Sequence, residues 1–303
     1  MVRRFALIAV LLQGSNKSLS SQDTTRAPLI DEVHVLWGAL AQKEPFMTQI
    51  DWRALVPGSA LLRSEALSTM ERYGGGGGFR GGQISHAISA GVSINLIRNF
   101  PEQTRSKHLR IALFHSPSNG MNAYWSARSS GPLDTLIGQV NGDTVFVDTV
   151  FIESFRAIHR SSRTGLDISY VVESNRRSQF SWQIGFGVLA GLTGRNKVAI
   201  WHTYETRFDG WVSWDEHYPE IRRNEVAAIE SLRVPPSFWG GGYLHFGVGV
   251  RLSRSHPFWN SVQLKSEARP SLMLSNFASA PWRTSAAFQL LIGAGIDLHR
   301  TGT

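Results

Sequence analysis

Hydrophobic and polar residues alternate one by one along the last part of the chain. Between residues 285 and 298, apolar residues fall at every second position, and small or polar residues fill most of the others. Because successive side chains of a β-strand point to opposite faces, this alternation predicts one long strand. We expect Phe288, Leu290 and Ile292 to share the apolar face, and Gln289 and Asp297 to share the other.

The same two-residue period recurs from Gln83 onward. The alternating segments include 84–96, 166–173, 180–192, 243–252 and 262–274. We count about seven strong strands, whereas a barrel in a bacterial outer membrane has an even number. An eighth strand is therefore expected from the N-terminal region or the Gly-rich stretch, although its position cannot be assigned from the pattern.

The chemistry of the two faces distinguishes a membrane barrel from a soluble one. The polar face is rich in Gly, Gln, Lys, Glu and Arg, which cannot fill a soluble core but can line a narrow lumen, where the charges pair. The apolar face would then meet lipid. We predict an all-β fold, an up-and-down antiparallel transmembrane β-barrel of about eight strands with a partly helical N-terminal extension. A soluble lipocalin-like barrel is the alternative.

The first 82 residues follow a different pattern. Arg3 and Arg4 precede the apolar stretch Phe5–Leu12, as in a secretory signal, and we expect cleavage near Ser20. Residues 59–72 have helical spacing, and the run 74–78 consists of glycine, which is typical of a linker. The expected domains are a signal peptide (1–20), an N-terminal extension with a helix and a Gly-rich linker (21–82), and the barrel (83–303).

The connections between strands alternate between short and long. Residues 174–178 and 253–260 are expected to form tight turns, and residues 131–144 and 208–236 long loops at the opposite strand ends. Aromatic residues gather near the strand ends, as an interfacial girdle would. They are Phe180, Trp182, Phe238, Trp239, Phe258, Trp259 and Trp282.

Charged residues on the polar faces are candidates for the lumen. They could form a mixed-sign network that fills a narrow barrel, or they could line a selective pore. About eight strands leave little more room than side chains fill, which favours the network. The predicted lumen residues are Arg110, Asp167, Glu173, Arg251, Lys265, Glu267, Arg269 and Asp297.

The second long loop holds the best binding candidates. Trp211, Trp214 and Tyr218 on an extracellular loop could contact a glycan or a protein ligand, with self-packing of the loop as the alternative. His202 and the loop residues 215–217 (Asp-Glu-His) include metal-binding residue types, but their spacing matches no compact ligand pattern, so we predict no metal.

The sequence contains no grouping that predicts catalysis or a cofactor. It has no cysteine, which excludes disulfides, thiolate metal sites and cysteine nucleophiles. Serine and histidine are plentiful but nothing groups them, and the glycine run lacks the Lys-Ser/Thr of a phosphate loop. We therefore predict no catalytic residue and no cofactor. A membrane-embedded hydrolase or acyltransferase is the least favoured function.

Composition and charge narrow the class of partner. Charged residues make up 18% of the chain, fewer than the quarter usual in soluble domains. The longest apolar stretch, Phe5–Leu12, is too short for a spanning helix, which excludes a helical membrane protein. The net charge is +8, but the basic residues are scattered and no nucleic-acid motif is present. Outer-membrane lipid and lipopolysaccharide are the expected partners, with no nucleic acid.

From Leu55 to its end, the chain resembles the β-barrel outer-membrane proteins of uncharacterised function from Bacteroidota-type bacteria. The resemblance rests on the segments 56–62, 132–135, 144–148 and the Gly-rich strand 180–192. The chain departs from the usual pattern by ending on Arg300–Thr303 rather than on an aromatic residue. The resemblance implies a barrel in the bacterial outer membrane, and no substrate or active site.

The sequence therefore predicts an outer-membrane barrel with a plugged polar lumen and a structural or surface-interaction role through long extracellular loops. A narrow passive pore for small solutes is the alternative.

Overall fold

The computed structural model describes residues 30–43, 47–72, 82–96, 105–137, 144–174, 178–211, 221–253, 255–276 and 282–298. The expected signal peptide and the glycine run 74–78 lie outside these residues. The elements are, in chain order, β1 (Ile30–Lys43), α2 (Gln49–Leu55), η2 (Leu61–Arg63), α3 (Glu65–Ser68), β2 (Glu71–Arg72), β3 (Gly82–Asn95), β4 (Ser106–Ile137), β5 (Thr144–Glu173), β6 (Phe180–Trp211), β7 (Ile221–Arg233), β8 (Phe238–Arg251), α4 (Pro257–Ser261), β9 (Val262–Ser275) and β10 (Arg283–Asp297).

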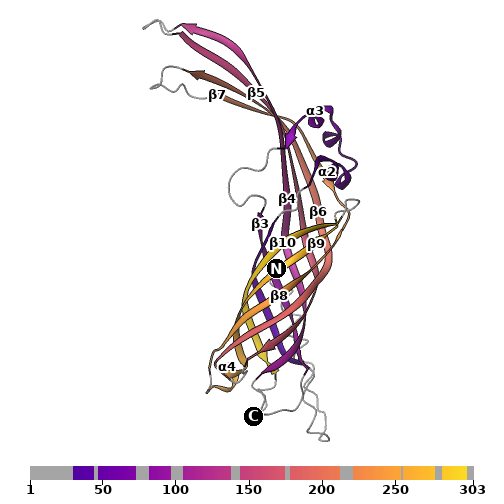
Figure 1. Cartoon of the computed structure of the whole chain (residues 1–303), viewed down its shortest axis with the longest axis vertical. Coiled ribbons are helices and arrows are strands. Elements are labelled where there is room, and N and C mark those ends of the chain that lie inside the picture. The colour runs from indigo at the N-terminus through magenta and orange to yellow at the C-terminus, as the bar shows by residue number, and fades with distance from the viewer. Residues whose placement is uncertain are drawn as a thin grey trace.

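Eight of the strands close into a ring, in the order β1-β3-β4-β5-β6-β8-β9-β10 (Figure 1). Every pairing is antiparallel, and each ring strand pairs with the ring strands that precede and follow it along the chain. The predicted fold is therefore confirmed: an all-β, up-and-down barrel with a closed sheet.

The eighth strand is β1, which pairs with β10 from Glu32↔Asp297 to Gln42↔Ala287. It lies inside the region expected to be an extension, so the boundary expected between residues 82 and 83 is corrected: the barrel begins at Ile30. Ring closure requires this strand, because without it β3 and β10 would each have an unpaired edge.

The barrel has a tall wall and a short wall. β4, β5 and β6 contain 32, 30 and 32 residues, whereas β1, β3, β8 and β9 contain 14 each and β10 contains 15. At about 3.3 Å per residue, the tall strands extend to about 105 Å and the short ones to about 46 Å. β7 pairs with the upper part of β6 (Figure 1). The part of β4–β7 above the barrel is called the surface sheet below.

The surface sheet corrects the two expected long loops. Residues 131–137 and 144 onward continue the β4–β5 ladder to the pair Ile137↔Thr144. Residues up to Trp211 continue β6, and β7 occupies residues 221–233. Both stretches are polar and aromatic, and β-branched and aromatic residues with antiparallel partners favour a strand over a loop.

The two faces of the barrel have the predicted chemistry. On β10, Phe288, Leu290 and Ile292 are 44%, 47% and 61% exposed on the outside, whereas Gln289 and Asp297 are buried inside. Most of the expected aromatic girdle is exposed, but Trp239 is a correction, because its side chain is buried in the lumen. It occupies an inward position of β8, between the outward Phe238 and Gly240.

Residues 47–70, called the cap below, connect β1 to β2. The single helix expected at residues 59–72 is instead split into η2 and α3, and α2 precedes them. Ser59 and Ser64 each cap a new turn with their hydroxyls, which interrupts a continuous helix. The last two expected helical residues form β2, which pairs with the free edge of β4 at Ser126 and Trp125.

Candidate functional site

The lower lumen holds a network of buried ions. The Arg110 guanidinium on β4 donates to Glu267 Oε1 of β9 at 2.8 Å. The Arg269 guanidinium donates to Glu267 Oε2 at 2.8 Å and to Asp167 Oδ2 of β5 at 2.6 Å. Two cations and two anions thus neutralise each other across three strands. All four side chains are at most 3% exposed. Tyr243 donates its hydroxyl proton to the same Asp167 carboxylate.

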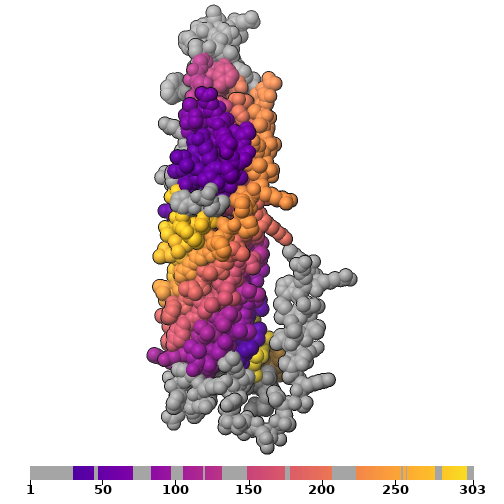
Figure 2. All heavy atoms as spheres, turned by 90° about the vertical axis from the view of Figure 1, so that its right-hand side faces the viewer, coloured from indigo at the N-terminus to yellow at the C-terminus, as the bar shows by residue number. Residues whose placement is uncertain are grey.

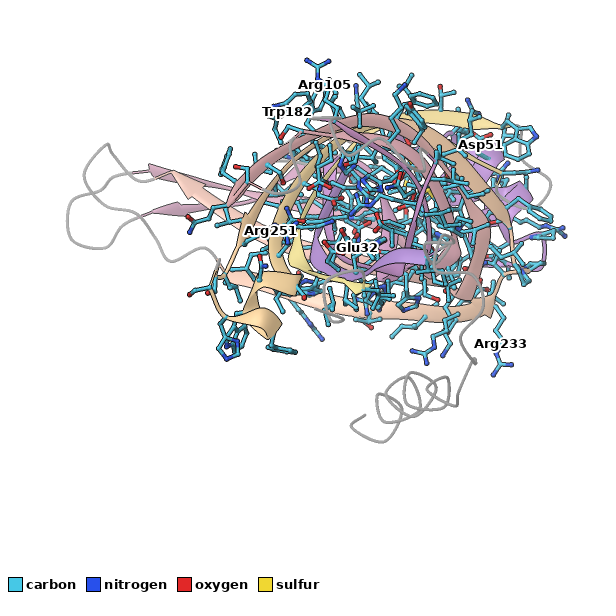
Figure 3. The ribbon with its side chains drawn as sticks, turned by 90° about the horizontal axis from the view of Figure 1, so that it is seen from below. Glu32, Asp51, Arg105, Trp182, Arg233 and Arg251 are labelled. Atoms are coloured by element: carbon cyan, nitrogen blue, oxygen red, sulfur yellow. The ribbon has the colours of Figure 1, made fainter. Side chains whose placement is uncertain are left out.

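Two further ion pairs and a hydrogen bond extend the network toward the end of the barrel where β1 begins and β10 ends. Lys265 pairs with Glu32 of β1, and Arg251 Nη2 lies 3.6 Å from Asp297 Oδ2. Glu173 accepts a hydrogen bond from the Ser181 hydroxyl at 2.8 Å. Figure 3, seen from below, shows Glu32 within the ring of strands and Trp182 outside it. Each of the eight lumen residues named from the sequence is buried. Seven of them form ion pairs, and Glu173 accepts hydrogen bonds from Ser181 and Gln263.

Sequence reasoning missed the contributions of β1. Asp31, Glu32 and His34 are buried in the lumen and bring two carboxylates close to Lys265 and His108. The signal was present, because Val33, Val35 and Trp37 alternate with Glu32 and His34, as in the other strands. The stretches on either side of β1 lack this alternation, so the strand was not recognised from the sequence.

An apolar layer lies above the ion network. It is built by inward side chains from seven of the eight ring strands, and Phe114 and Trp239 meet in it with ring centroids 5.6 Å apart. A polar solute cannot cross this layer without losing its hydrogen bonds to water. Its members are Leu36, Leu40, Ala87, Phe114, Leu189, Trp239, Tyr243, Met273, Ala287 and Leu291.

The cap forms a third layer. Its apolar side chains pack on the inner face of the tall wall, where Trp52 meets Trp125 edge to face at 6.2 Å between ring centroids. Figures 1 and 2 show the cap directly above the barrel strands. The shared core comprises Met47, Trp52, Leu55, Val56, Leu62, Leu67, Met70, Met121, Ala123, Trp125, Phe155, Ala157, Val198, Ile200 and Val234.

Two carboxylates fasten the cap on opposite sides. Glu230 of β7 accepts from the Ser59 hydroxyl at 2.5 Å and from the backbone N–H of Leu61 at 3.1 Å. Asp51 pairs with Arg283, the first residue of β10, at 2.9 Å. Burial alone would raise the pKa of Asp51, but hydrogen bonds from Thr48 and the Arg283 guanidinium outweigh it and lower the pKa below its ordinary 3.8.

The loop candidates fall mostly outside the described residues. Trp211 is the last residue of β6 and pairs with Phe146, and the structure describes its backbone only. Trp214 and Tyr218, together with the metal candidates at 215–217, lie in the undescribed stretch 212–220. His202 Nε2 donates to Glu153 Oε1 at 2.7 Å, and its ring stacks on Phe155 at 4.1 Å between ring centroids.

Within the described residues, no group of three or more His, Cys, Asp or Glu side chains is arranged to hold a metal ion. None of the described helices is long and apolar enough to cross a membrane.

Comparisons with known proteins add little to this geometry. No protein-family model and no curated protein matches the chain. Among solved structures, it is similar to the transport unit of the autotransporter AIDA-I from Escherichia coli, at 10% identity over 96% of this chain and 97% of that one, with a TM-score of 0.22. It is also similar to a Pseudomonas aeruginosa FadL homologue, at 8% identity over 89% and 91%, with a TM-score of 0.21. Such scores carry no argument about function. The closed ring and its apolar exterior are what make this chain a barrel-type outer-membrane protein.

Proposed function

We propose that the protein is a closed outer-membrane barrel that holds a rigid β-sheet outside the membrane as a binding surface. The observation that supports the proposal is that buried side chains of the described residues form three successive layers along the lumen, which are the ion network, the apolar layer and the cap. An eight-stranded barrel is just wide enough for side chains to fill. We therefore expect no continuous path for ions and solutes through this barrel.

The orientation follows from the strand count. β1 begins and β10 ends at the same end of the barrel, where β5 and β8 also end and β6 and β9 begin. In bacterial barrels of even strand number, the short turns are periplasmic and the long connections extracellular. The cap and the surface sheet would therefore face the outside of the cell, and Trp211, Trp214 and Tyr218 would contact a glycan or protein there.

The absence of cysteine from the chain allows a clean test of this orientation. Ser231→Cys, on the exposed face of β7, should react with a membrane-impermeant maleimide on intact cells. Ser174→Cys, in a turn at the other end, should react only after the outer membrane is opened. Labelling of Ser174→Cys alone on intact cells would reverse the proposed orientation.

Planar-bilayer recording tests the closed lumen. The wild-type protein should show no stable conductance, because the lumen layers leave no water-filled passage. Replacing Lys265, Glu267 and Arg269 with Ala should loosen the lowest layer and lower stability, whereas the apolar layer above stays in place. A stable, ion-selective conductance of the wild-type protein would overturn the proposal in favour of a narrow passive pore.

One arrangement favours a second candidate function, a hydrolase. Ser106 Oγ lies 2.8 Å from His108 Nε2, and His108 Nδ1 lies 3.4 Å from Asp31 Oδ2. A hydroxyl, an imidazole and a carboxylate in this order can activate the serine as a nucleophile. However, Glu173 also lies 3.7 Å from His108 Nε2, which ties the imidazole into the ion network.

A fluorophosphonate probe distinguishes the two roles of Ser106. A serine in the ion network alone should stay unlabelled, as we expect. Labelling that is lost in both Ser106→Ala and His108→Gln would instead establish the hydrolase, with Ser116→Ala as the matched control.

A further inference from the structure

Three basic side chains stand in one row on the outer face of the tall wall. Arg160 of β5 lies directly opposite Lys197 of β6, and Lys197 lies directly opposite Arg233 of β7. All three are exposed, whereas the inward neighbours His159 and Val198 are buried. Figure 3 shows Arg233 pointing away from the barrel. The row therefore faces the surroundings of the barrel and not the core beneath the cap.

Like charges directly opposite each other on paired strands repel, and this repulsion destabilises the sheet. No hydrogen bond or ion pair of these three side chains is found among the described residues, and the nearest outward positions along the strands, at Ile158, Ala199 and Ser231, are not acidic. A cluster of like charges raises the local concentration of anions, and an anion from outside the chain would relieve the repulsion within this row.

Arg195 adds a fourth cation through a strained backbone. Its φ of 50° lies in the left-handed region. Among the described residues other than glycine, Arg195 alone has a positive φ. It lies in a bulge between the pairs Arg160↔Lys197 and Ser162↔Gly194. Bulges re-aim side chains, and strain of this kind is often kept at binding sites. The Arg195 side chain is exposed, on the same stretch of β6 as Lys197.

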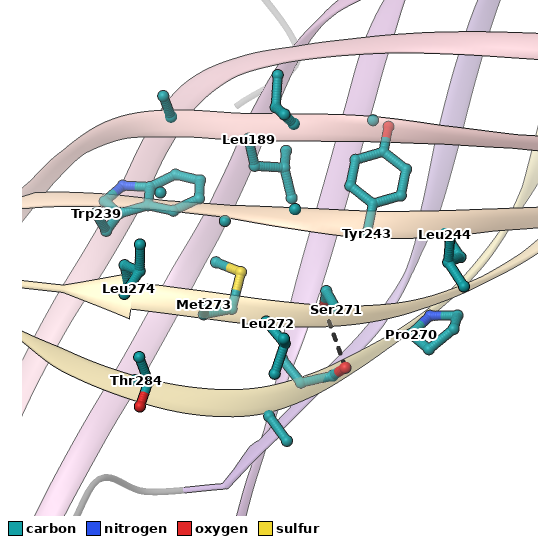
Figure 4. A pocket seen from close by; sticks show the side chains of 18 of the residues that line it. Leu189, Trp239, Tyr243, Leu244, Pro270, Ser271, Leu272, Met273, Leu274 and Thr284 are labelled. Atoms are coloured by element: carbon teal, nitrogen blue, oxygen red, sulfur yellow. Dashed lines mark hydrogen bonds between the residues drawn. The ribbon is translucent and has the colours of Figure 1, made fainter.

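An apolar groove of about 1590 Å³ lies on the outer wall, below the cations, and is lined by β6, β8, β9 and β10 (Figure 4). Its sides are large exposed residues, such as Phe186, Phe238 and Leu272, and its floor contains Gly240 and Gly242. Its uppermost lining residue on β6 is Ala190, seven residues along the strand from Lys197, or about 23 Å.

Gly242 shows that the groove is not a by-product of tight packing. Many glycines of this barrel are required by sterics, since a Cβ at Gly38 would lie 1.8 Å from the Leu290 carbonyl oxygen. A Cβ at Gly242 would meet only the Gly187 carbonyl oxygen, at 3.9 Å. A larger outward residue would therefore fit at position 242 and would fill the groove. The glycine keeps the floor open.

We propose that the cation row and the groove together form a binding site for one phosphorylated glycolipid of the outer leaflet. The phosphate groups would lie on Arg160, Arg195, Lys197 and Arg233, and an acyl chain would lie in the groove. Arginine suits phosphate because its planar guanidinium donates two parallel hydrogen bonds. A cationic rim above an apolar groove has the charge and the polarity of such a lipid, in the order in which the leaflet presents them.

The test is a titration of the full-length protein in zwitterionic detergent with bis-phosphorylated lipid A, read by native mass spectrometry. The dephosphorylated lipid should bind at least tenfold more weakly. Lys197→Gln/Arg233→Gln should weaken binding of the phosphorylated lipid at least tenfold. The matched control, Arg105→Gln/Lys107→Gln, removes the same charge at the opposite end and should stay within twofold of wild type.

Gly242→Leu tests the groove separately. It should weaken binding of both lipid forms at least threefold, whereas Ala90→Leu, on the lipid-facing side of β3, should not. Heat-modifiable mobility on a gel verifies that each variant is folded. Equal binding of the two lipid forms, wild-type affinity of Lys197→Gln/Arg233→Gln, or displacement of the lipid by a tenfold excess of inorganic phosphate would each overturn the site. The assignment to the outer leaflet rests on the proposed orientation of the barrel. Because the assay is done in detergent, its outcome does not depend on orientation or on lumen closure, so failure of the site and failure of the proposed function can be distinguished.

Discussion

The lower and upper halves of β5 have the same alternation but opposite chemistry. In the lower half, Asp167 and Glu173 are buried, and Leu166 and Ile168 are exposed. In the upper half, Phe155 and Ala157 are buried, while Arg160 is exposed. The inward face is continuous between them, because Arg163, Ser161 and His159 are also buried. One strand thus passes from a lipid-facing barrel to an ordinary water-facing sheet with a core.

The difference shows that the solvent, and not the strand, decides which face is apolar. Below about Thr164 the outward side chains meet hydrocarbon, so the outside is apolar and the charges pair within the lumen. Above it the outward side chains meet water, so the apolar residues are buried beneath the cap. The basic row at Arg160, Lys197 and Arg233 lies at this transition.

The largest expected effect is at the centre of the lower half. Glu267→Gln leaves the buried guanidiniums of Arg110 and Arg269 without their shared carboxylate. We expect the free energy of unfolding to fall by about 3–5 kcal/mol, as when one partner of a buried ion pair is removed. Urea unfolding in lipid vesicles measures this, with the outward Ser266→Ala as control. A loss below about 1 kcal/mol would contradict the network's role.

The core of the upper half can be removed separately. Trp125→Ala should destabilise the docking of the cap by about 3–5 kcal/mol, because a large buried side chain is lost from the contact with Trp52. Protease should then cleave within residues 47–72, while the barrel keeps its heat-modifiable mobility. Tyr124→Ala, on the outward face, is the control. If cleavage stays at the wild-type rate, the cap is not held by this core.

The two outward faces should differ in how strongly a change of polarity affects stability. Ile292→Arg places a charge in the lipid-facing belt and should cost about 2–4 kcal/mol near the middle of the bilayer. Arg156→Leu makes the reverse change on the surface sheet and should alter stability by less than about 0.5 kcal/mol. Unfolding titrations of both variants measure the contrast. Equal effects would mean that the membrane boundary lies elsewhere.

The smallest effect concerns the tie between the cap and β10. Because the folded-state pKa of Asp51 is lowered, its stabilisation is fully present above pH 3.8 and is lost as the pH falls through the lower folded value. Asp51→Ala should cost about 1 kcal/mol at pH 7, because it removes one half of the capping box with Thr48 and the ion pair with Arg283. The rate at which protease cleaves the cap of Asp51→Ala should then depend less on pH, between pH 5 and pH 3, than the wild-type rate does. If both proteins show the same pH dependence, Asp51 is not the group whose protonation loosens the cap.

Much of the fold was readable from the alternation, since the faces of β6, β8, β9 and β10 follow from a period of two. The same pattern identified the lumen residues, because a charge between apolar neighbours such as Leu264 and Ala268 must point inward. The surface sheet was not readable: residues 208–236 look polar enough for a loop until β6 and β7 are seen to pair. Pairing is a long-range property that local composition does not report.

The sequence by itself determined the all-β class, the apolar exterior and the charged lumen, because each depends only on which neighbours alternate along one strand. The tertiary structure decided what depends on distant segments. It placed β1 in the ring, since an open sheet would leave two edges unpaired. It buried Trp239 in the lumen, and it set Arg160, Lys197 and Arg233 side by side from three strands. Register across strands creates these contacts, and register is fixed only when the whole sheet closes.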